Sequence, residues 1–534
     1  MFIKTSIRKQ SNGKKYRTHY IVEGFRDPKS KKVKHKYVAN LTNLPAHIVL
    51  SIQKLLKNNK GELTKLDLAD MQILCNKEYG NIKLFKALYE KYFAKYFKNT
   101  GYNKAIQAIV LNKIFNPKSK NGLKNWLSKV DMGYEITNKN DLYECLDYLE
   151  EEQPKIEQDL STALVKNRDC NILLYDITST YFEGKGAENI CKYGYSRDHR
   201  RDRVQVNIGV ITTADGTPIS VEILAGNISD KTTLQDQIKK LQEKFDLKEI
   251  TFVFDRGMKS KVNLKKLEEV GYSYITALSH AELKKKCDNY QEVQYGLFDK
   301  QDLAEFEIDN KYYSLVHNVT KATKDRETRR SLINKTTEKL EAIKNLKRNH
   351  SLRSLQDKIS KVINKYNCSK FISYTIEEFK DGSGVVYGKL EYGISEDKIK
   401  EVEQYDGFYM IESTNKSIQG DKAVSQYKDL QLVERAFDVV KNHIEIRPVF
   451  HYKESRIKGH IMSSFMSYFL VHKFKQKCKE LLKEYTLDDL LTELSNIHKT
   501  YFKINNFCFE KITQVSNLAD KILKLFHVKL LSPA

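Results

Sequence analysis

Three side chains that could act together recur at intervals of seven residues late in the chain: Tyr427, Glu434 and Lys441. Seven residues are close to two helical turns, so a continuous helix would place all three on one face. Apolar residues recur between them at spacings of three and four: Leu430, Val433, Phe437 and Val440. This pattern predicts an amphipathic helix that buries one stripe and anchors the carboxylate of Glu434. The alternative is an ordinary surface helix whose Glu and Lys side chains are solvated.

Two aspartates elsewhere occupy places where a carboxylate needs a partner. Asp176 lies inside the run N-I-L-L-Y-D-I-T-S-T-Y-F, which predicts a strand buried on both faces, and burying its charge is costly unless a positive charge meets it. Asp255 ends the apolar run I-T-F-V-F and precedes Arg256 and Gly257, at a strand end of the kind where α/β sheets place their sites. Each aspartate alone could be a helix cap or a turn residue. Together with Glu434 they offer the oxygen ligands that suit Mg²⁺ or Mn²⁺.

The segments around these carboxylates resemble the DDE transposases of bacterial insertion sequences, of the IS-four superfamily type with a Tyr-Arg-Glu-Lys signature. The resemblance rests on Y-D-I-T-S-T-Y-F, F-D-R-G-M and the Tyr-x6-Glu-x6-Lys spacing, and on G-Y-S-R-D-H-R-R-D, A-G-N-I-S-D-K-T-T-L and the run V-E-R-A-F through I-E-I-R-P-V-F-H. It covers about residues 171–470 and, weakly, the first fifty residues. One position departs from the signature, because Leu430 stands where the family has Arg. Lys428 or Arg435 could supply that phosphate contact instead.

The resemblance implies a catalytic site in which Asp176, Asp255 and Glu434 hold two Mg²⁺ or Mn²⁺ ions, with Asp176 bridging both. Two ions about 3.5 to 4 Å apart can activate an attacking oxygen and stabilise the leaving one. Water would first attack the phosphodiester at the transposon end, and the freed 3′ hydroxyl would then attack target DNA in the same site. Whether a hairpin intermediate forms stays open.

The resemblance also implies contacts to DNA. Lys441 and Tyr427 would bind phosphate or orient the terminal strand, Lys441 as a point charge, and Arg256 is a further candidate contact beside Asp255. The expected partners are double-stranded DNA, as terminal inverted repeats and as target, and a second copy of the chain in the DNA complex. Two alternatives remain: an RNase H-like nuclease without strand transfer, and a decayed or domesticated transposase that only binds DNA.

Composition agrees with a nucleic-acid partner. The 534 residues contain 92 Lys and Arg against 69 Asp and Glu, a formal net charge of +23, which indicates a polyanionic ligand; a merely solvated Lys-rich surface is the alternative. No apolar run approaches the roughly 18 residues of a spanning helix and no secretory signal is evident, so we expect a cytoplasmic, nucleoid-associated protein with no membrane contact. The eight cysteines form no C-x-x-C pair, which argues against structural zinc and disulfides.

We expect an α/β protein with an RNase H-like catalytic core interrupted by a mixed α/β insertion and preceded by a basic β-hairpin and a helical DNA-binding region. Met1 to Asn40 holds 12 Lys or Arg against two acids, and we expect it to contact phosphates; the alternative is a solvated hairpin whose charge blunts its edges. Helical periodicity follows, with Pro117 and Pro154 as interruptions. The insertion has no Trp; Tyr312 or Tyr313 could stack on a base there, although core tyrosines are the commoner explanation. The expected regions are the hairpin (1–43), the helical region (44–170), the first core part (171–279), the insertion (280–404), the second core part (405–474) and a helical tail (475–534).

Overall fold

The computed structural model describes residues 1–9, 15–27, 31–58, 71–165, 171–245, 250–290, 293, 302–346, 351–380, 386–447, 449–504 and 507–530. The chain forms two compact units. The first consists of residues 1–76 and 500–511, and the second of residues 77–499 and 512–534. In the described ranges no helix is both long enough and apolar enough to cross a membrane. Seven cysteines are described and all are free thiols, most of them buried; Cys170 lies outside the described residues.

The N-terminal segment folds into a three-stranded antiparallel sheet beside one helix: β1 (Phe2–Lys9), β2 (Lys15–Arg26), β3 (Val33–Asn40) and α1 (Ala46–Asn58). The predicted hairpin corresponds to β2 and β3. β1 was not predicted; it pairs with β2 so that Phe2 lies opposite Val22. The basic segment is therefore a sheet with a small core of its own, formed by Ile3, Leu41 and Val49.

A second three-stranded sheet joins residues from both ends of the chain, in the order β16-β15-β4. Its strands are β4 (Met71–Glu78), β15 (His498–Ile504) and β16 (Phe507–Ile512). The prediction of a wholly helical tail was wrong here, because these short strands are specified by pairing with a distant segment rather than by local periodicity. The tail also contains α17 (Leu487–Ser495) and α18 (Asn517–Leu525).

An eight-stranded mixed sheet forms the centre of the second unit, in the order β10-β11-β14-β9-β8-β5-β6-β7. Its strands are β5 (Asn171–Tyr181), β6 (Gln205–Thr213), β7 (Pro218–Ala225), β8 (Ile250–Phe254), β9 (Ser273–Ala277), β10 (Leu303–Ile308), β11 (Lys311–His317) and β14 (Phe408–Ser413). β5 pairs in parallel with β8, and β8 with β9, whereas the other neighbouring strands of this sheet pair antiparallel. The α/β class is confirmed. β10 and β11 extend this sheet, although the sequence analysis placed them in the insertion.

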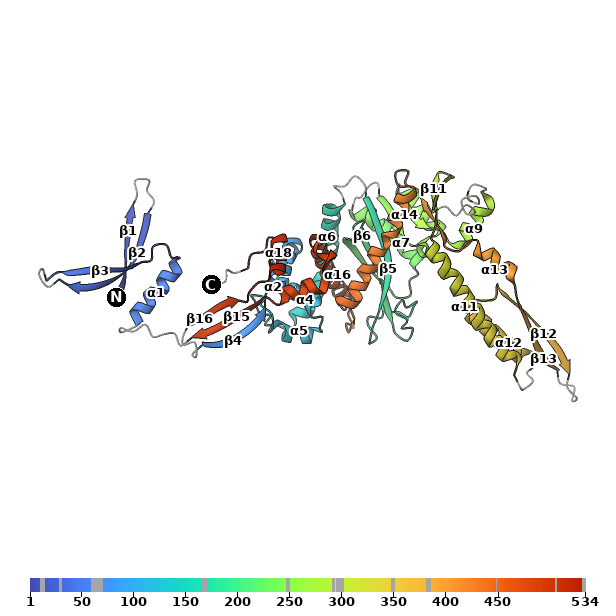
Figure 1. Ribbon diagram of the computed structural model, residues 1–534, viewed down its shortest axis with the longest axis horizontal. Coiled ribbons are helices and arrows are strands. Elements are labelled where there is room, and N and C mark those ends of the chain that lie inside the picture. The colour runs from blue at the N-terminus through green and yellow to red at the C-terminus, as the bar shows by residue number, and fades with distance from the viewer. Residues whose placement is uncertain are drawn as a thin grey trace. The chain divides into compact units, whose positions relative to one another are not determined.

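The two faces of the sheet are covered by different helices (Figure 1). On β5, Leu173, Tyr175 and Ile177 pack against α7 (Asp230–Phe245) and α8 (Lys261–Glu269). Side chains alternate along a strand, so Asp176 lies on the opposite face, with Leu174. That face meets α14 (Gly420–Lys428), α15 (Leu430–Asp438) and α16 (Glu454–Lys477).

Helix α16 also packs into a bundle with the helices that precede the sheet. These are α2 (Gly80–Tyr92), α3 (Ala94–Phe97), α4 (Asn103–Phe115), α5 (Lys120–Leu127) and α6 (Asp141–Leu164). Gly459 allows α16 to approach α6 closely, because a Cβ there would clash with the Leu146 carbonyl. Pro154 lies inside α6 and does not end it, since Leu149 and Ile156 on either side are both buried in the shared core. The helical region and the sheet therefore have one continuous core.

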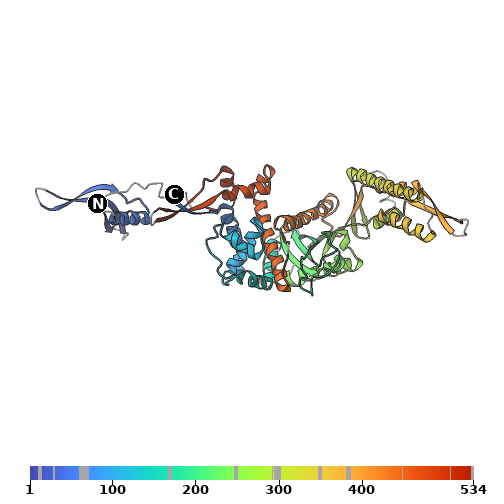
Figure 2. The same ribbon diagram turned by 90° about the horizontal axis from the view of Figure 1, so that it is seen from below.

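The insertion has a core of its own, formed where two long helices pack on a hairpin. Figure 2 shows the helices in yellow and the hairpin in orange. The helices are α11 (Val319–Lys344) and α12 (Leu352–Lys365), and the hairpin strands are β12 (Ile372–Lys380) and β13 (Val386–Ile394). Two shorter helices flank this arm, α9 (His280–Asn289) and α13 (Glu396–Glu403). Tyr313 is buried in the adjoining core, which agrees with a structural role for that residue.

Candidate active site

The two aspartates of the site lie on neighbouring strands. The parallel pairing of β5 and β8 places Tyr175 opposite Phe254, so Asp176 and Asp255 follow at matching positions on strands about 4.8 Å apart. Asp255 is exposed where β8 ends, and its Oδ2 accepts the Gly257 N–H at 3.3 Å, which begins a short 3₁₀ turn. The strand register therefore determines the separation of the two carboxylates.

Asp176 is partly buried in the middle of β5, facing α15. Its Oδ1 accepts the N–H of Ile177 at 2.7 Å. The pKa of Asp176 is raised to about 7, mainly by burial and also by the charges of Asp255 and Glu434, while the Ile177 hydrogen bond and Arg197 oppose the shift. Asp176 is thus a carboxylate whose negative charge lacks full compensation within the protein.

Glu434 lies on α15, which packs on β5, and its side chain is exposed. Its charge acts on Asp176. The predicted continuous helix over Tyr427–Lys441 was wrong: α14 ends at Lys428, α15 spans nine residues, and a π-helical turn follows over Val439–His443. The Ile444 N–H donates to the Val439 carbonyl at 2.9 Å, closing the wider turn. The π turn shifts the helical phase after Glu434, so a regular α-helix does not continue from Glu434 through Lys441.

Tyr427 still reaches the site, from the last turn of α14. Its hydroxyl donates to Asp255 Oδ1 at 3.0 Å. Burial, together with the Asp255 carboxylate, raises the pKa of Tyr427 well above its usual value, so the hydroxyl keeps its proton. Tyr427 therefore connects the helical side of the site to the end of β8.

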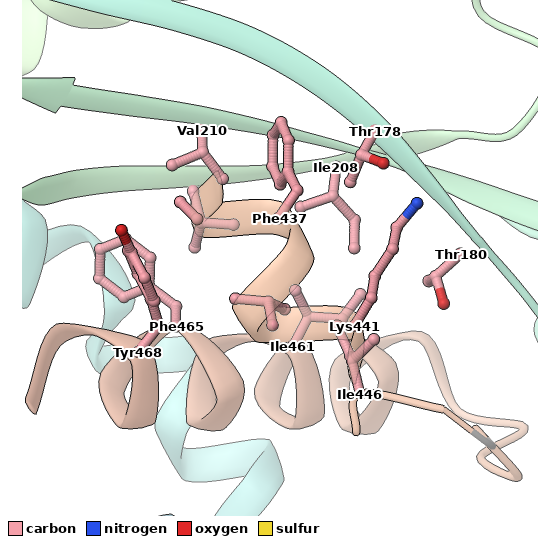
Figure 3. Close-up of a pocket in the computed structure, with 13 residues that line it drawn as sticks. Thr178, Thr180, Ile208, Val210, Phe437, Lys441, Ile446, Ile461, Phe465 and Tyr468 are labelled. Atoms are coloured by element: carbon pink, nitrogen blue, oxygen red, sulfur yellow. The ribbon is translucent and has the colours of Figure 1, made fainter. Parts of the chain in front are cut away.

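Lys441 is directed to a different partner from the one the sequence suggested. Its Nζ donates to Asp198 Oδ1 at 2.9 Å, and Arg447 Nη1 lies 3.2 Å from Asp198 Oδ2. Figure 3 shows the Lys441 amino group close to Thr178 and Thr180 of β5, above a small apolar cavity of about 20 Å³. A cavity of that size holds about one water molecule and no substrate.

The sequence analysis missed Asp198 and Arg447 as part of this region. Both lie in segments that carried the family resemblance, G-Y-S-R-D-H-R-R-D and I-E-I-R-P-V-F-H, but a basic segment gives no indication of which acid is buried. The Asp198 side chain is only 10% exposed, and the Arg197 N–H donates to Ser179 Oγ at 3.0 Å, which ties the segment to β5.

The remaining candidate DNA contacts are all exposed. Arg256 follows Asp255 directly and lies near enough to Tyr427 to influence its ionisation. Lys428 and Arg435 are on the helices that carry Tyr427 and Glu434. Their positions allow contact with a ligand that approaches the carboxylates from solvent.

The three carboxylates do not form a closed metal-binding set. Within the described ranges no three His, Cys, Asp or Glu side chains lie close enough to share one metal ion. The arrangement provides two aspartate donors on adjacent strands and a glutamate on the facing helix.

Comparison with known proteins identifies two families. Residues 171–470, more than half of the chain, match the family described as the transposase DDE domain, and residues 3–65 match the N-terminal domain of IS1634 family transposases. No curated protein matches the chain. A solved structure that matches is the Mos1 transposase paired-end complex with left transposon end, at 15% identity over 43% of this chain and 68% of that one, with a TM-score of 0.15.

Proposed function

This chain belongs to the DDE transposases of bacterial insertion sequences, and from that premise we propose that it binds the terminal inverted repeats of its element, cuts there and joins the 3′ ends to target DNA. The observation that carries the proposal is the placement of Asp176 and Asp255 on adjacent strands, facing the helix of Glu434. These three residues are the proposed catalytic carboxylates.

The topology of the sheet supports this assignment. Strands β7-β6-β5-β8-β9 follow one another in space, with β5 central; β6 runs antiparallel to both β5 and β7, whereas β8 and β9 run parallel to β5. We propose that this half of the sheet is an RNase H-like core, extended by β14, β11 and β10. The long separation between Asp255 and Glu434 in sequence is then occupied by the insertion.

The donor set fits hard divalent cations. All three side chains offer carboxylate oxygens, and Asp176 stands among negative charges that a cation would offset. We propose that Asp176, Asp255 and Glu434 hold two Mg²⁺ or Mn²⁺ ions. When bound, such ions supply activation of the attacking oxygen and stabilisation of the leaving one.

The chain's other residues would hold the reacting strand in place. The hydrogen bond from Tyr427 orients Asp255, and the exposed side chains of Arg256, Lys428 and Arg435 are proposed to contact phosphates beside the carboxylates. Lys441 is proposed to act on the terminal strand from its position against Asp198. Asp176, with its raised pKa, must give up its Oδ proton before it can act as a ligand.

The basic parts of the chain are the basis for proposing further contacts with DNA. The basic sheet of β1, β2 and β3, the helical region and the long insertion helices are proposed DNA-binding surfaces, and the complex with paired ends is proposed to contain two copies of the chain. The proposed location is the bacterial cytoplasm, in association with the nucleoid.

The test uses DNA that carries the element's ends, with Mg²⁺ or Mn²⁺, and compares the intact protein with Asp176→Ala and Glu434→Ala. Asp438→Ala is the matched control, because it removes another exposed carboxylate from α15. We expect joined products from the intact protein and the control, and end binding without chemistry from the other two. Cleavage without joining would favour a nuclease, and binding without cleavage would leave only a DNA-binding protein.

A further inference from the structure

A second strongly charged region lies away from the carboxylates, between α4, α5 and the start of α16. Lys113 of α4 and Lys120 of α5 are 5% and 7% exposed, and between them lies His460 of α16, also 7% exposed. Lys120 Nζ is 2.9 Å from His460 Nδ1, and Lys113 Nζ is 3.3 Å from His460 Nε2. Within the described residues, no carboxylate pairs with either ammonium group.

The histidine cannot satisfy both lysines. His460 Nε2 also lies 3.0 Å from the Ile446 carbonyl, which can only accept a hydrogen bond. A neutral imidazole has one donor and one acceptor nitrogen, and burial together with the two lysines lowers the pKa of His460 well below its usual value. If Nε2 donates to Ile446, Nδ1 accepts from Lys120, and Lys113 then faces a donor. In the other tautomer Lys120 faces the donor, so when both lysines are protonated one of them lacks an acceptor in either tautomer.

These groups line an open cavity of about 540 Å³. Its wall also includes Lys118 and Arg447, and the first turn of α5, where backbone N–H groups carry partial positive charge. Among the described residues of the wall, Glu445 alone carries a carboxylate, and it is exposed. A cavity with four cationic side chains and an unsatisfied buried donor is suited to an anion.

Arg447 connects this cavity to the carboxylate site. It forms part of the wall, pairs with Asp198, and lies with its guanidinium 4.9 Å from the ring of Tyr181, the last residue of β5. Tyr181 is five residues beyond Asp176 on the same strand, a span of about 16 Å. A DNA strand advances about 3.4 Å per phosphate along the helix axis, so roughly five nucleotides would cover that distance.

We propose that the cavity around Lys113 and Lys120, here called the lysine pocket, binds a phosphate group of the DNA strand that extends from the carboxylates past Tyr181. The inference rests on the proposed function as a transposase. The phosphate oxygens supply the missing acceptor for the buried lysines. Burial lowers the pKa of Lys120 to about 8 and that of Lys113 well below its usual value, so binding of the anion draws protons onto these amines.

The experiment measures binding of the full chain to a duplex carrying the element's end, without metal, over a range of salt concentrations. The variants are Lys113→Met and Lys120→Met, singly and together, because Met retains the apolar stem and needs no partner. The control is Lys124→Met, which removes an equal charge from an exposed position of the same helix. Circular dichroism and thermal unfolding confirm that each variant is folded, and Gln replaces Met where it is not.

We expect the double variant to bind the ends about tenfold more weakly, with a salt dependence less steep by roughly one unit in total, because the pocket neutralises one phosphate. Calorimetry at pH 8.5, in two buffers of different ionisation enthalpy, should show proton uptake on binding by the intact protein and by Lys124→Met, and none by the double variant. Unchanged affinity and unchanged proton uptake in the double variant would overturn the proposal.

A second arm uses inorganic phosphate as the probe, with chloride at equal ionic strength as its reference. If phosphate raises the unfolding temperature of the intact protein but not of the double variant, while DNA binding is the same for both, the pocket holds a free phosphate and the DNA assignment is wrong. The failure of the proposed function has a different signature. It is the absence of end binding or chemistry in the intact protein, whereas the pocket is judged only by the difference between variants.

Discussion

The two halves of the carboxylate site are held by different kinds of structure. Asp176 lies in β5 and Asp255 directly follows the paired strand β8, and each side chain also accepts a backbone N–H one or two residues further along the chain. Glu434 is exposed on a nine-residue helix that is bounded by a break at Asp429 and by a π turn. One half of the site is therefore determined by the sheet, and the other half by how a short helix is placed against it.

The placement of that helix depends on contacts beyond its ends. Lys441 in the π turn and Arg447 after it both pair with Asp198, whose neighbour is tied to β5. Tyr427, before the helix, is hydrogen-bonded to Asp255. These contacts beyond both ends of α15 therefore determine where Glu434 stands relative to the two aspartates.

The strongest test of this contrast changes carboxylate length on each side. Asp176→Glu lengthens a side chain whose strand cannot move, and we expect a loss of joining of about 10³-fold, since misplacement by about 1 Å can cost 10²-fold and ligation suffers as well. Glu434→Asp shortens a side chain on the helix, and we expect a loss of about tenfold. Single-turnover cleavage and joining rates measure both. Equal losses at the two positions would show that the helix is as fixed as the strand.

A second test concerns the stability of the metal-free protein. The pKa of Asp176 is about 7 in the folded state and about 3.9 when unfolded, so the contribution of Asp176 to folding stability is greatest below pH 4, falls as the pH rises toward 7, and is level above it. Asp176→Asn removes this loss. We expect the substitution to raise the free energy of unfolding by roughly 2–3 kcal/mol more at pH 8 than at pH 5. Urea unfolding in EDTA measures it, with Asp438→Asn as a control that should follow the intact protein. A gain that does not depend on pH would contradict this account.

A third test loosens the contacts that place the helix. Asp198→Asn leaves Lys441 and Arg447 without their anion, and we expect a loss of about 2 kcal/mol in unfolding free energy, below the usual value for a fully buried pair because both cations are partly exposed. Asp202→Asn is the matched control from the same segment, because its carboxylate is 61% exposed and pairs only at the surface, where such pairs contribute little. If both variants lose the same unfolding free energy, the pairing of Asp198 with Lys441 and Arg447 contributes no more than a surface ion pair.

Much of the strand-borne half was predictable from sequence, for a physical reason. The apolar runs around Asp176 and Asp255 have the length and composition of buried strands, and β5, β8 and β9 form where the sequence predicts them. A buried strand can be predicted from a short apolar run bounded by turn residues, and both are local features of the sequence.

The helix-borne half was less predictable, because its decisive features are not local. A π turn inserts one residue without changing composition, so the regular spacing of Tyr427, Glu434 and Lys441 suggested one uninterrupted helix. The pairing of Lys441 with Asp198 joins residues 243 positions apart. Strand β15 is likewise a neighbour of β4 in one sheet, although most of the sequence separates the two strands. The burial of Lys113 and Lys120 could not be predicted from the sequence either, because lysine in a basic sequence usually indicates a solvated surface.

The smallest expected effect tests the link between the two halves. Tyr427→Phe deletes the hydroxyl that donates to Asp255 Oδ1 at 3.0 Å while keeping the ring that packs against the core. A hydrogen bond to a charged group contributes roughly 1.5–3 kcal/mol, and less where the acceptor is exposed, as Asp255 is. We therefore expect Tyr427→Phe to lower the free energy of unfolding by about 1 kcal/mol and the cleavage rate by several-fold. Tyr452→Phe, at a residue 73% exposed, should change neither quantity. If Tyr427→Phe instead equals Asp176→Glu in its effect on joining, the hydroxyl contacts the reacting strand, and its role as a support for Asp255 is wrong.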